Sequence, residues 1–143
     1  MEQPATAVER FFKAFAGNNS TWNIPALVSQ FADVFMVAGP QETQCVRAAD
    51  LALALPRRKQ LFDSFGCRST ELVSLNESRL DARYVIAKAK WQMNLVRKDG
   101  DAQRVLADSV YIVDTSAEAL KIVFYLTSQD HMALMKEHGI LPG

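Results

Sequence analysis

The sequence has no excess of charge of either sign, because its 16 lysine and arginine side chains are balanced by 16 aspartate and glutamate side chains. Proteins that bind nucleic acids or anionic membrane surfaces usually carry a strongly basic face. The balanced composition therefore argues against both kinds of partner.

Long apolar runs and an export signal are also missing. No apolar stretch approaches the roughly 18 residues that suggest a membrane-spanning helix. Residues 1–11, MEQPATAVERF, contain neither the basic nor the apolar segment of a signal peptide. We therefore expect a cytoplasmic protein that does not enter a membrane.

Metal-binding side chains are scarce. The two cysteines, Cys45 and Cys67, have no CxxC or Cys/His spacing, and we expect both to be reduced thiols. The two histidines, His131 and His138, flank an expected C-terminal helix and do not lie on a strand. The sequence thus predicts neither a metal site nor a cofactor.

The most informative segment is a long predicted strand at residues 81–96. Every second residue from Arg83 to Leu95 lies on one face, which is mostly apolar, and the opposite face is polar at its centre. A strand this long exceeds the usual length of about five to six residues, so it must twist and bend. The chain of 143 residues fits one domain, residues 1–143, with a curved sheet whose hollow needs filling.

Two helices are predicted before the first strand. Thr6 and Glu9 have the spacing of a capping box, and we expect the helix that they begin to end at Gly17. Its buried stripe has helical spacing and consists of Val8, Phe11, Phe12 and Phe15. A second helix is expected at residues 24–31, with Asn23 as its cap.

A short hairpin and more helix follow. The hairpin pairs residues 33–38 with residues 43–47 across a Gly-Pro turn. Residues 48–55 are helical, and Pro56 either kinks this helix or begins a second one that runs to Phe65.

A basic triplet, Arg57-Arg58-Lys59, invites a phosphate-binding hypothesis. Three successive residues span about 300° around a helix, so they cannot converge on one anion. We therefore interpret the triplet as a solvated face.

The second half is mostly strand. Strands are predicted at residues 70–75, 104–113 and 120–127 besides the long one, with a turn at 76–78 and a final helix capped by Asp130. Both faces of the last two strands are apolar; at 120–127, alternation puts Val123 and Tyr125 on one face and Ile122, Phe124 and Leu126 on the other. The second apolar face needs a cover, which predicts a homodimer through the outer face of the sheet.

This order of elements resembles the nuclear transport factor 2-like superfamily, in particular its SnoaL-like and ketosteroid-isomerase-like members. The resemblance lies in VERFFKAFAGNN, FADVFMVAGP, KWQMNLVRKDGDAQRVLADSVYIVD and LKIVFYLTSQD. It implies an α+β fold in which a curved antiparallel sheet wraps around the N-terminal helices as a cone-shaped barrel with an internal pocket. It also implies dimerisation through the outer sheet face.

The catalytic residues of ketosteroid isomerases have no counterparts in this chain. The resemblance aligns Gly39 with the aspartate base, Phe11 with the tyrosine donor and Ser109 with the buried carboxylic acid. Proton abstraction beside a carbonyl needs a base within reach and donors directed at the developing oxyanion. We therefore do not expect isomerisation of the steroid type.

The remaining site candidates are polar or aromatic residues on inward faces. Asp33 shares a strand face with Phe35 and Val37, so it is either a general base or a carboxylate that bonds backbone amides. Trp91 is expected to serve either as a pocket residue or as core. The predicted ligand-binding residues are Phe11, Phe15, Phe35, Val37, Trp91, Met93, Ser109, Tyr111 and Phe124.

Two hypotheses about function remain. In the first, the protein binds a small, largely apolar molecule in an internal cavity and is an enzyme of isomerase, cyclase or dehydratase type or a binding protein. In the second, it is a non-catalytic homodimeric interaction module, and the same aromatic side chains fill the cavity.

Overall fold

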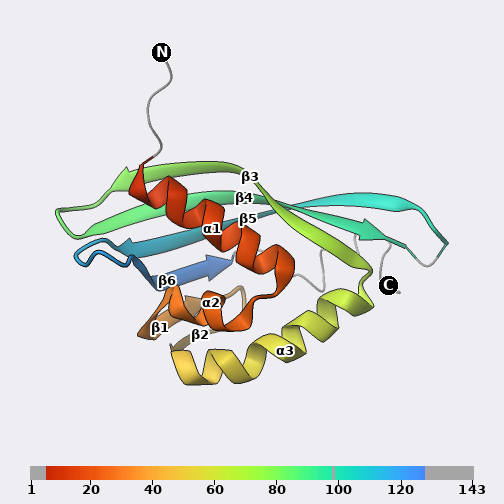
Figure 1. Ribbon diagram of the computed structural model, residues 1–143, viewed down its shortest axis with the longest axis horizontal. Coiled ribbons are helices and arrows are strands. Elements are labelled where there is room, and N and C mark those ends of the chain that lie inside the picture. Colours follow the sequence, from red (N-terminus) through yellow and green to blue (C-terminus); the bar gives the residue numbers. More distant parts are fainter. Residues whose placement is uncertain (1–5, 98, 128–143) are drawn as a thin grey trace, which may run out of the picture.

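A computed structural model describes residues 6–97 and 99–127 and shows helices packed on one face of a six-stranded sheet (Figure 1). The helices are α1 (Ala7–Thr21), α2 (Ile24–Ser29) and α3 (Ala48–Ser64). The strands are β1 (Phe31–Ala38), β2 (Thr43–Arg47), β3 (Cys67–Arg79), β4 (Tyr84–Val96), β5 (Ala102–Asp114) and β6 (Lys121–Thr127). The predicted α+β class is confirmed. No described helix is long and apolar enough to cross a membrane.

The sheet is mixed and open. Its strand order is β2-β1-β6-β5-β4-β3, and β1 runs parallel to β6 while all other neighbours are antiparallel. The second half of the chain thus forms the predicted four-stranded antiparallel meander. The first hairpin adds to its free edge, because β6 offers unpaired backbone groups to β1.

The alternation predicted for the long strand is confirmed in β4. Its residues Val85, Ala87, Ala89, Trp91, Met93 and Leu95 are all buried. The neighbouring strand β5 follows the same rule, with Val105, Ala107, Ser109, Tyr111 and Val113 buried. These side chains point toward the helices, so this face of the sheet forms the core.

The predicted turn at residues 76–78 is wrong. The strand β3 continues through it to Arg79, and Asn76, Glu77 and Ser78 lie opposite β4. Pairing along the whole length of β4 outweighs the local turn preference of these residues. The actual turn follows Arg79, where the Asp81 carboxylate accepts hydrogen bonds from two backbone amides, those of Arg83 and Tyr84.

The first helix begins as predicted and ends later. The Thr6 hydroxyl accepts a hydrogen bond of 3.0 Å from the Glu9 amide. Gly17 does not end the helix, which runs one more turn to Thr21 and closes at Trp22 with a left-handed φ of 52°. Tertiary contacts hold this turn, because the Ser20 hydroxyl donates to the Thr70 carbonyl of β3.

The segment after α2 also differs from the prediction. Phe31 begins β1 and does not close α2, and α3 is one helix with Pro56 inside it.

Gly66 follows α3 with a φ of 79°, and a Cβ there would lie 2.1 Å from the Val96 carbonyl oxygen. Only glycine fits this junction without strain. The predicted final helix lies outside the described residues.

A bulge in β6 changes which side chains point inward. Val113 lies opposite Ile122 but Ile112 lies opposite Phe124, so Val123 is an extra residue in β6. The extra residue reverses the alternation. As a result Ile122 is fully buried and Tyr125 lies opposite Tyr111 on the inner face, whereas Phe124 points to the outer face.

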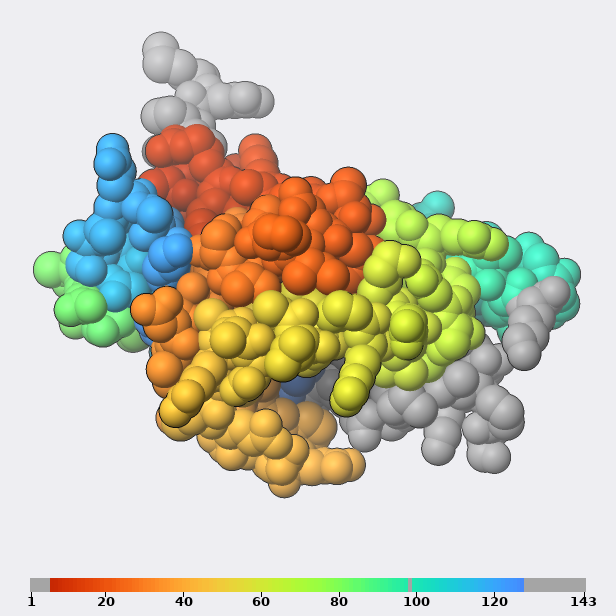
Figure 2. All heavy atoms as spheres, turned by 60° about the horizontal axis from the view of Figure 1, so that its bottom comes forward, coloured from red at the N-terminus to blue at the C-terminus, as the bar shows by residue number. Residues whose placement is uncertain are grey.

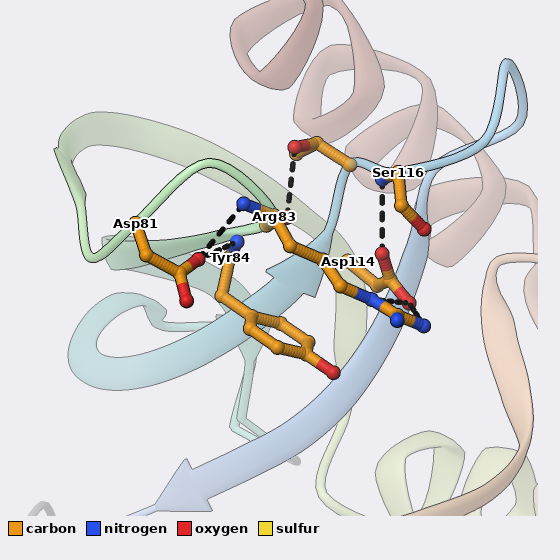
Figure 3. A network of polar contacts seen from close by, with 6 residues as sticks. Asp81, Arg83, Tyr84, Asp114 and Ser116 are labelled. Atoms are coloured by element: carbon orange, nitrogen blue, oxygen red, sulfur yellow. Dashed lines mark hydrogen bonds and ion pairs between the residues drawn. The ribbon is translucent and has the colours of Figure 1, made fainter.

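One end of the sheet carries a polar network (Figure 3). Arg83, in the turn before β4, donates to the Asp114 carboxylate at the end of β5, with an Nη2–Oδ2 distance of 2.8 Å. The same carboxylate accepts from the Ser116 amide at 2.9 Å. The pKa of Asp114 is held well below its usual value, first by the Arg83 hydrogen bond and then by those from Ser116. The network therefore joins two neighbouring loops.

Candidate functional site

A cavity of about 460 Å³ lies between the helices and the inner face of the sheet. Figure 2 shows a hollow between α3 and the β1–β2 hairpin, and both of these contribute residues to the cavity lining. Small-molecule sites in proteins are concave and typically measure about 300–1,000 Å³. The cavity therefore has the size of a small-molecule site.

Aromatic side chains from every layer of the fold contribute to the wall. The helices and β1 contribute Phe15, Trp22, Phe31, Phe35 and Phe62. The sheet contributes Trp91, Tyr111 and Tyr125. Tyr111 and Tyr125 stack with their centroids 5.1 Å apart, and Phe15 meets Tyr111 edge-on at 5.7 Å. Because each ring is held by its neighbours, the wall is rigid.

The structure brings most of the predicted ligand-binding residues to this wall. Those that line the cavity are Phe15, Phe35, Val37, Trp91, Met93, Ser109 and Tyr111. Phe11 does not line it and instead contacts Phe12 and Phe15, with ring centroids 5.2 and 6.4 Å away. Phe124 is on the outer face because of the bulge in β6, and Tyr125 takes the position expected for it.

Asp33 lies outside the cavity. It is exposed on β1, in the stretch between Phe31 and Met36 where pairing with β6 is interrupted. Within the described part of the chain, its side chain forms no hydrogen bond with a backbone amide. The geometry therefore supports neither of the two roles considered for Asp33.

One stripe of α3 forms the wall opposite the sheet. Its members recur at helical spacing and are Asp50, Leu51, Ala54, Leu55, Arg58 and Phe62. The sequence analysis missed this stripe, although the spacing of Leu51, Leu55 and Phe62 was a signal for it. Of the cavity-lining residues in the described chain, Asp50 is the one carboxylate and Arg58 the one cation.

The basic triplet divides between solvent and the cavity. Lys59 pairs with Asp63 one turn later on the exposed side of α3, with an Nζ–Oδ2 distance of 2.9 Å. Arg57 is exposed and does not line the cavity. Arg58 does, and its guanidinium carbon is 5.1 Å from the centroid of the Phe62 ring. All three side chains are exposed, which agrees with the solvated-face interpretation, and Arg58 in addition lines the cavity.

A polar group is fixed in the apolar wall of β5. The Tyr111 side chain is buried, and those of Ser109 and Trp91 hydrogen-bond with its hydroxyl group. The pKa of Tyr111 is raised far above its usual value, first by burial and then by the adjacent Tyr125. The Tyr111 phenol is therefore neutral at any physiological pH and remains able to donate a hydrogen bond.

Both cysteines are free thiols. Cys45 is exposed and lines the cavity, whereas Cys67 is half-buried near Thr70. Burial raises the pKa of the Cys67 thiol. Within residues 6–97 and 99–127, no three His, Cys, Asp or Glu side chains are grouped so that they could hold a metal ion.

The sequence matches no protein-family model and no curated protein. Several solved structures are nevertheless similar in fold. A nuclear transport factor 2-like protein with a cystatin-like fold from Novosphingobium aromaticivorans superposes with a TM-score of 0.70 and 11% identity, over 95% of this chain and 87% of that one. A ketosteroid isomerase-like protein from Erwinia carotovora atroseptica has a TM-score of 0.62 and 16% identity, over 85% and 92%.

A subunit of a larger enzyme has the same fold. The β subunit of benzoate 1,2-dioxygenase from Burkholderia mallei superposes with a TM-score of 0.67 and 15% identity, over 94% of this chain and 96% of that one. These similarities cover most of the chain and concern its fold. The chain therefore has the nuclear transport factor 2-like fold.

Proposed function

We propose that the protein binds a small, largely apolar molecule in the cavity. The observation that carries this proposal is the open space itself, about 460 Å³ among rigid aromatic side chains. Protein interiors are normally close-packed, and an empty space loses the dispersion contacts of its lining. A core whose role was structural alone would be expected to fill such a space with its own side chains.

An enzymatic role of isomerase, cyclase or dehydratase type is a finer proposal. It is supported by the Tyr111 hydroxyl, which can donate to a ligand carbonyl from within the apolar wall. The name of the ketosteroid isomerase-like neighbour is consistent with it. A candidate base must lie within hydrogen-bond reach of the proton that it removes. Asp50, in the first turn of α3, is the one carboxylate among the described lining residues, so it is the candidate base.

We also propose that two copies associate through the outer face of the sheet. Cross-strand neighbours on that face form an apolar row from β1 to β4: Met36, Phe124, Ile112 and Ile86. Val110 and Leu126 form a second row beside it. The face is opposite the helices, so no helix of the described chain covers it (Figure 1). A second copy would bury these rows symmetrically.

The alternative is a non-catalytic homodimeric interaction module, which the same outer face favours. The β subunit of benzoate 1,2-dioxygenase is by its name part of a larger assembly. In this alternative the cavity would be filled and would take up no ligand.

The two functions can be separated with the chain's own tryptophans. Both of them, Trp22 and Trp91, line the cavity, so a ligand that absorbs at their emission wavelengths will quench them. We expect the neutral probe pyrene-1-carboxamide to quench this fluorescence saturably. The residue Ala54 lines the cavity and Ala49 does not, so Ala54→Leu should weaken binding several-fold and Ala49→Leu should leave it unchanged.

Native mass spectrometry of the freshly purified protein completes the test. A dimer that carries a defined extra mass would support the binding proposal and reveal the ligand's class. Absence of both quenching and retained mass would refute ligand binding and favour the interaction module. A monomer at all concentrations would refute association through the outer face.

A further inference from the structure

Resting on the proposed binding function, we propose that the ligand is amphiphilic, with an apolar aromatic body and a carboxylate that Arg58 binds at the cavity wall. This names a chemical class, aromatic and other apolar carboxylic acids in their ionised form. The inference depends on where Arg58 lies, on the partners that it lacks and on the surroundings that a ligand would share with it.

Arg58 is placed to meet a ligand. It belongs to the same stripe of α3 as Ala54 and Phe62, which also line the cavity. Its guanidinium group lies over the Phe62 ring at 5.1 Å. A guanidinium group is planar, and a carboxylate can accept two parallel hydrogen bonds from its N–H groups. Arginine at this position therefore suits a planar anion.

Arg58 forms no ion pair within the described chain. The ion pairs found there join Lys13, Lys59 and Arg83 to Glu9, Asp63 and Asp114. Its neighbours one helical turn away are Ala54 and Phe62, neither of which carries charge. Among the described residues, no carboxylate is paired with the guanidinium where a ligand anion would bind.

The charge of Arg58 favours an anionic ligand over a neutral one. The side chain is exposed, so a neutral ligand can leave it hydrated, whereas a carboxylate accepts charge-assisted hydrogen bonds from the guanidinium. The lining carboxylate Asp50 is eight residues away on the same helix, about 12 Å along its axis at 1.5 Å per residue, so it does not neutralise Arg58. A ligand carboxylate would supply the opposite charge at this end of the cavity.

The opposite wall of the cavity is formed by the sheet. Tyr111 on β5 and Arg58 on α3 line the same cavity, so one ligand can contact both. The carboxylate would lie at Arg58, and the apolar body would lie between Tyr111 and the phenylalanines of α1 and β1. Asp50 repels a carboxylate at the other end, so it favours this orientation.

The test compares two probes of nearly equal shape, pyrene-1-carboxylate and pyrene-1-carboxamide, by quenching of Trp22 and Trp91. We expect the full-length protein to bind the carboxylate about tenfold more tightly than the carboxamide, which corresponds to about 1.4 kcal/mol. In Arg58→Gln this preference should vanish through a weaker affinity for the carboxylate, and the affinity for the carboxamide should change less than about twofold. Arg57→Gln removes an exposed arginine next to it that does not line the cavity, and should keep the preference.

The outcomes separate this inference from the function on which it rests. Equal binding of both probes by the wild-type protein would overturn the anion preference and leave the cavity as a ligand site. An Arg58→Gln variant that still preferred the carboxylate probe would also overturn the role given to Arg58. Failure of both probes to bind would overturn the binding function itself. The wild-type comparison needs no variant, so the inference remains testable even where Arg58→Gln does not fold.

Discussion

Two glycine-to-alanine substitutions should shift stability in opposite directions. Gly66 joins α3 to β3 with a φ of 79°, and an added Cβ would lie 2.1 Å from the Val96 carbonyl oxygen. Gly17 lies inside α1, and nothing is within 4 Å of an added Cβ. The same chemical change therefore meets a backbone clash at one position and open space at the other.

The magnitudes follow from separate contributions. A non-glycine residue in the left-handed region costs about 1–2 kcal/mol. Relief of the clash must move the backbone and disturb the hydrogen bond of 2.9 Å from the Val96 amide to the Gly66 carbonyl, which contributes about 1 kcal/mol. We thus expect Gly66→Ala to lower the free energy of unfolding by about 2–3 kcal/mol and the melting temperature by about 6–9 °C. Gly17→Ala should raise the free energy of unfolding by about 0.5–1 kcal/mol.

Urea denaturation followed by tryptophan fluorescence and by circular dichroism measures both changes. The two signals should give one transition with an unchanged m-value for each variant, so that the shift in midpoint reports stability. A midpoint for Gly66→Ala equal to that of the wild-type protein would refute the argument from backbone conformation. A loss of stability in Gly17→Ala would show that α1 needs a glycine there for a reason that the space around it does not explain.

Three further predictions concern the sheet. The pKa of Asp114 is lowered by Arg83 and Ser116, so this carboxylate contributes stability that is present above its unfolded pKa of about 3.9 and is lost as the pH falls below that value. The melting temperature of Asp114→Asn should therefore fall less between pH 5 and pH 3 than that of the wild-type protein. An equal fall in both proteins would contradict this. Phe124→Asp on the outer face should convert a dimer to a monomer in light scattering without weakening probe binding, and a persistent dimer would place the interface elsewhere. Asp33→Asn should leave the affinity for pyrene-1-carboxamide unchanged because Asp33 lies outside the cavity, whereas a several-fold loss would show that it acts on the site.

Elements with strong local signals could be predicted from the sequence. Residue pattern and capping chemistry correctly predicted three features: the inner face of β4, the hairpin strand at Thr43–Arg47 and the cap at Thr6. In each case the cause is local: alternation along an extended chain or a hydroxyl three residues before an amide. The faces of β4 and β5 also predicted four residues of the cavity wall: Trp91, Met93, Ser109 and Tyr111.

The incorrect or missing parts depend on contacts between distant segments. The bulge at Val123 exchanges the inward and outward side chains in the second half of β6, and no residue type in that strand predicts a bulge. The last turn of α1 exists because Ser20 reaches β3, which brings Trp22 into the wall. In the sequence, Arg58 cannot be distinguished from its neighbours Arg57 and Lys59. Only the packing of α3 against the sheet shows that Arg58 lines the cavity and the other two do not.

The parallel junction between β1 and β6 has a consequence for the way the chain folds. Lys121 at the start of β6 donates a hydrogen bond to the Ser29 carbonyl, 92 residues earlier. Contacts across so long a loop are entropically expensive to close, and they slow folding. The first hairpin can join the sheet only once β6 has been synthesised, whereas α3 leads directly into β3 and packs Phe62 against residues of β4 and β5. The part of the cavity wall that β1 and β2 form is therefore assembled after the meander.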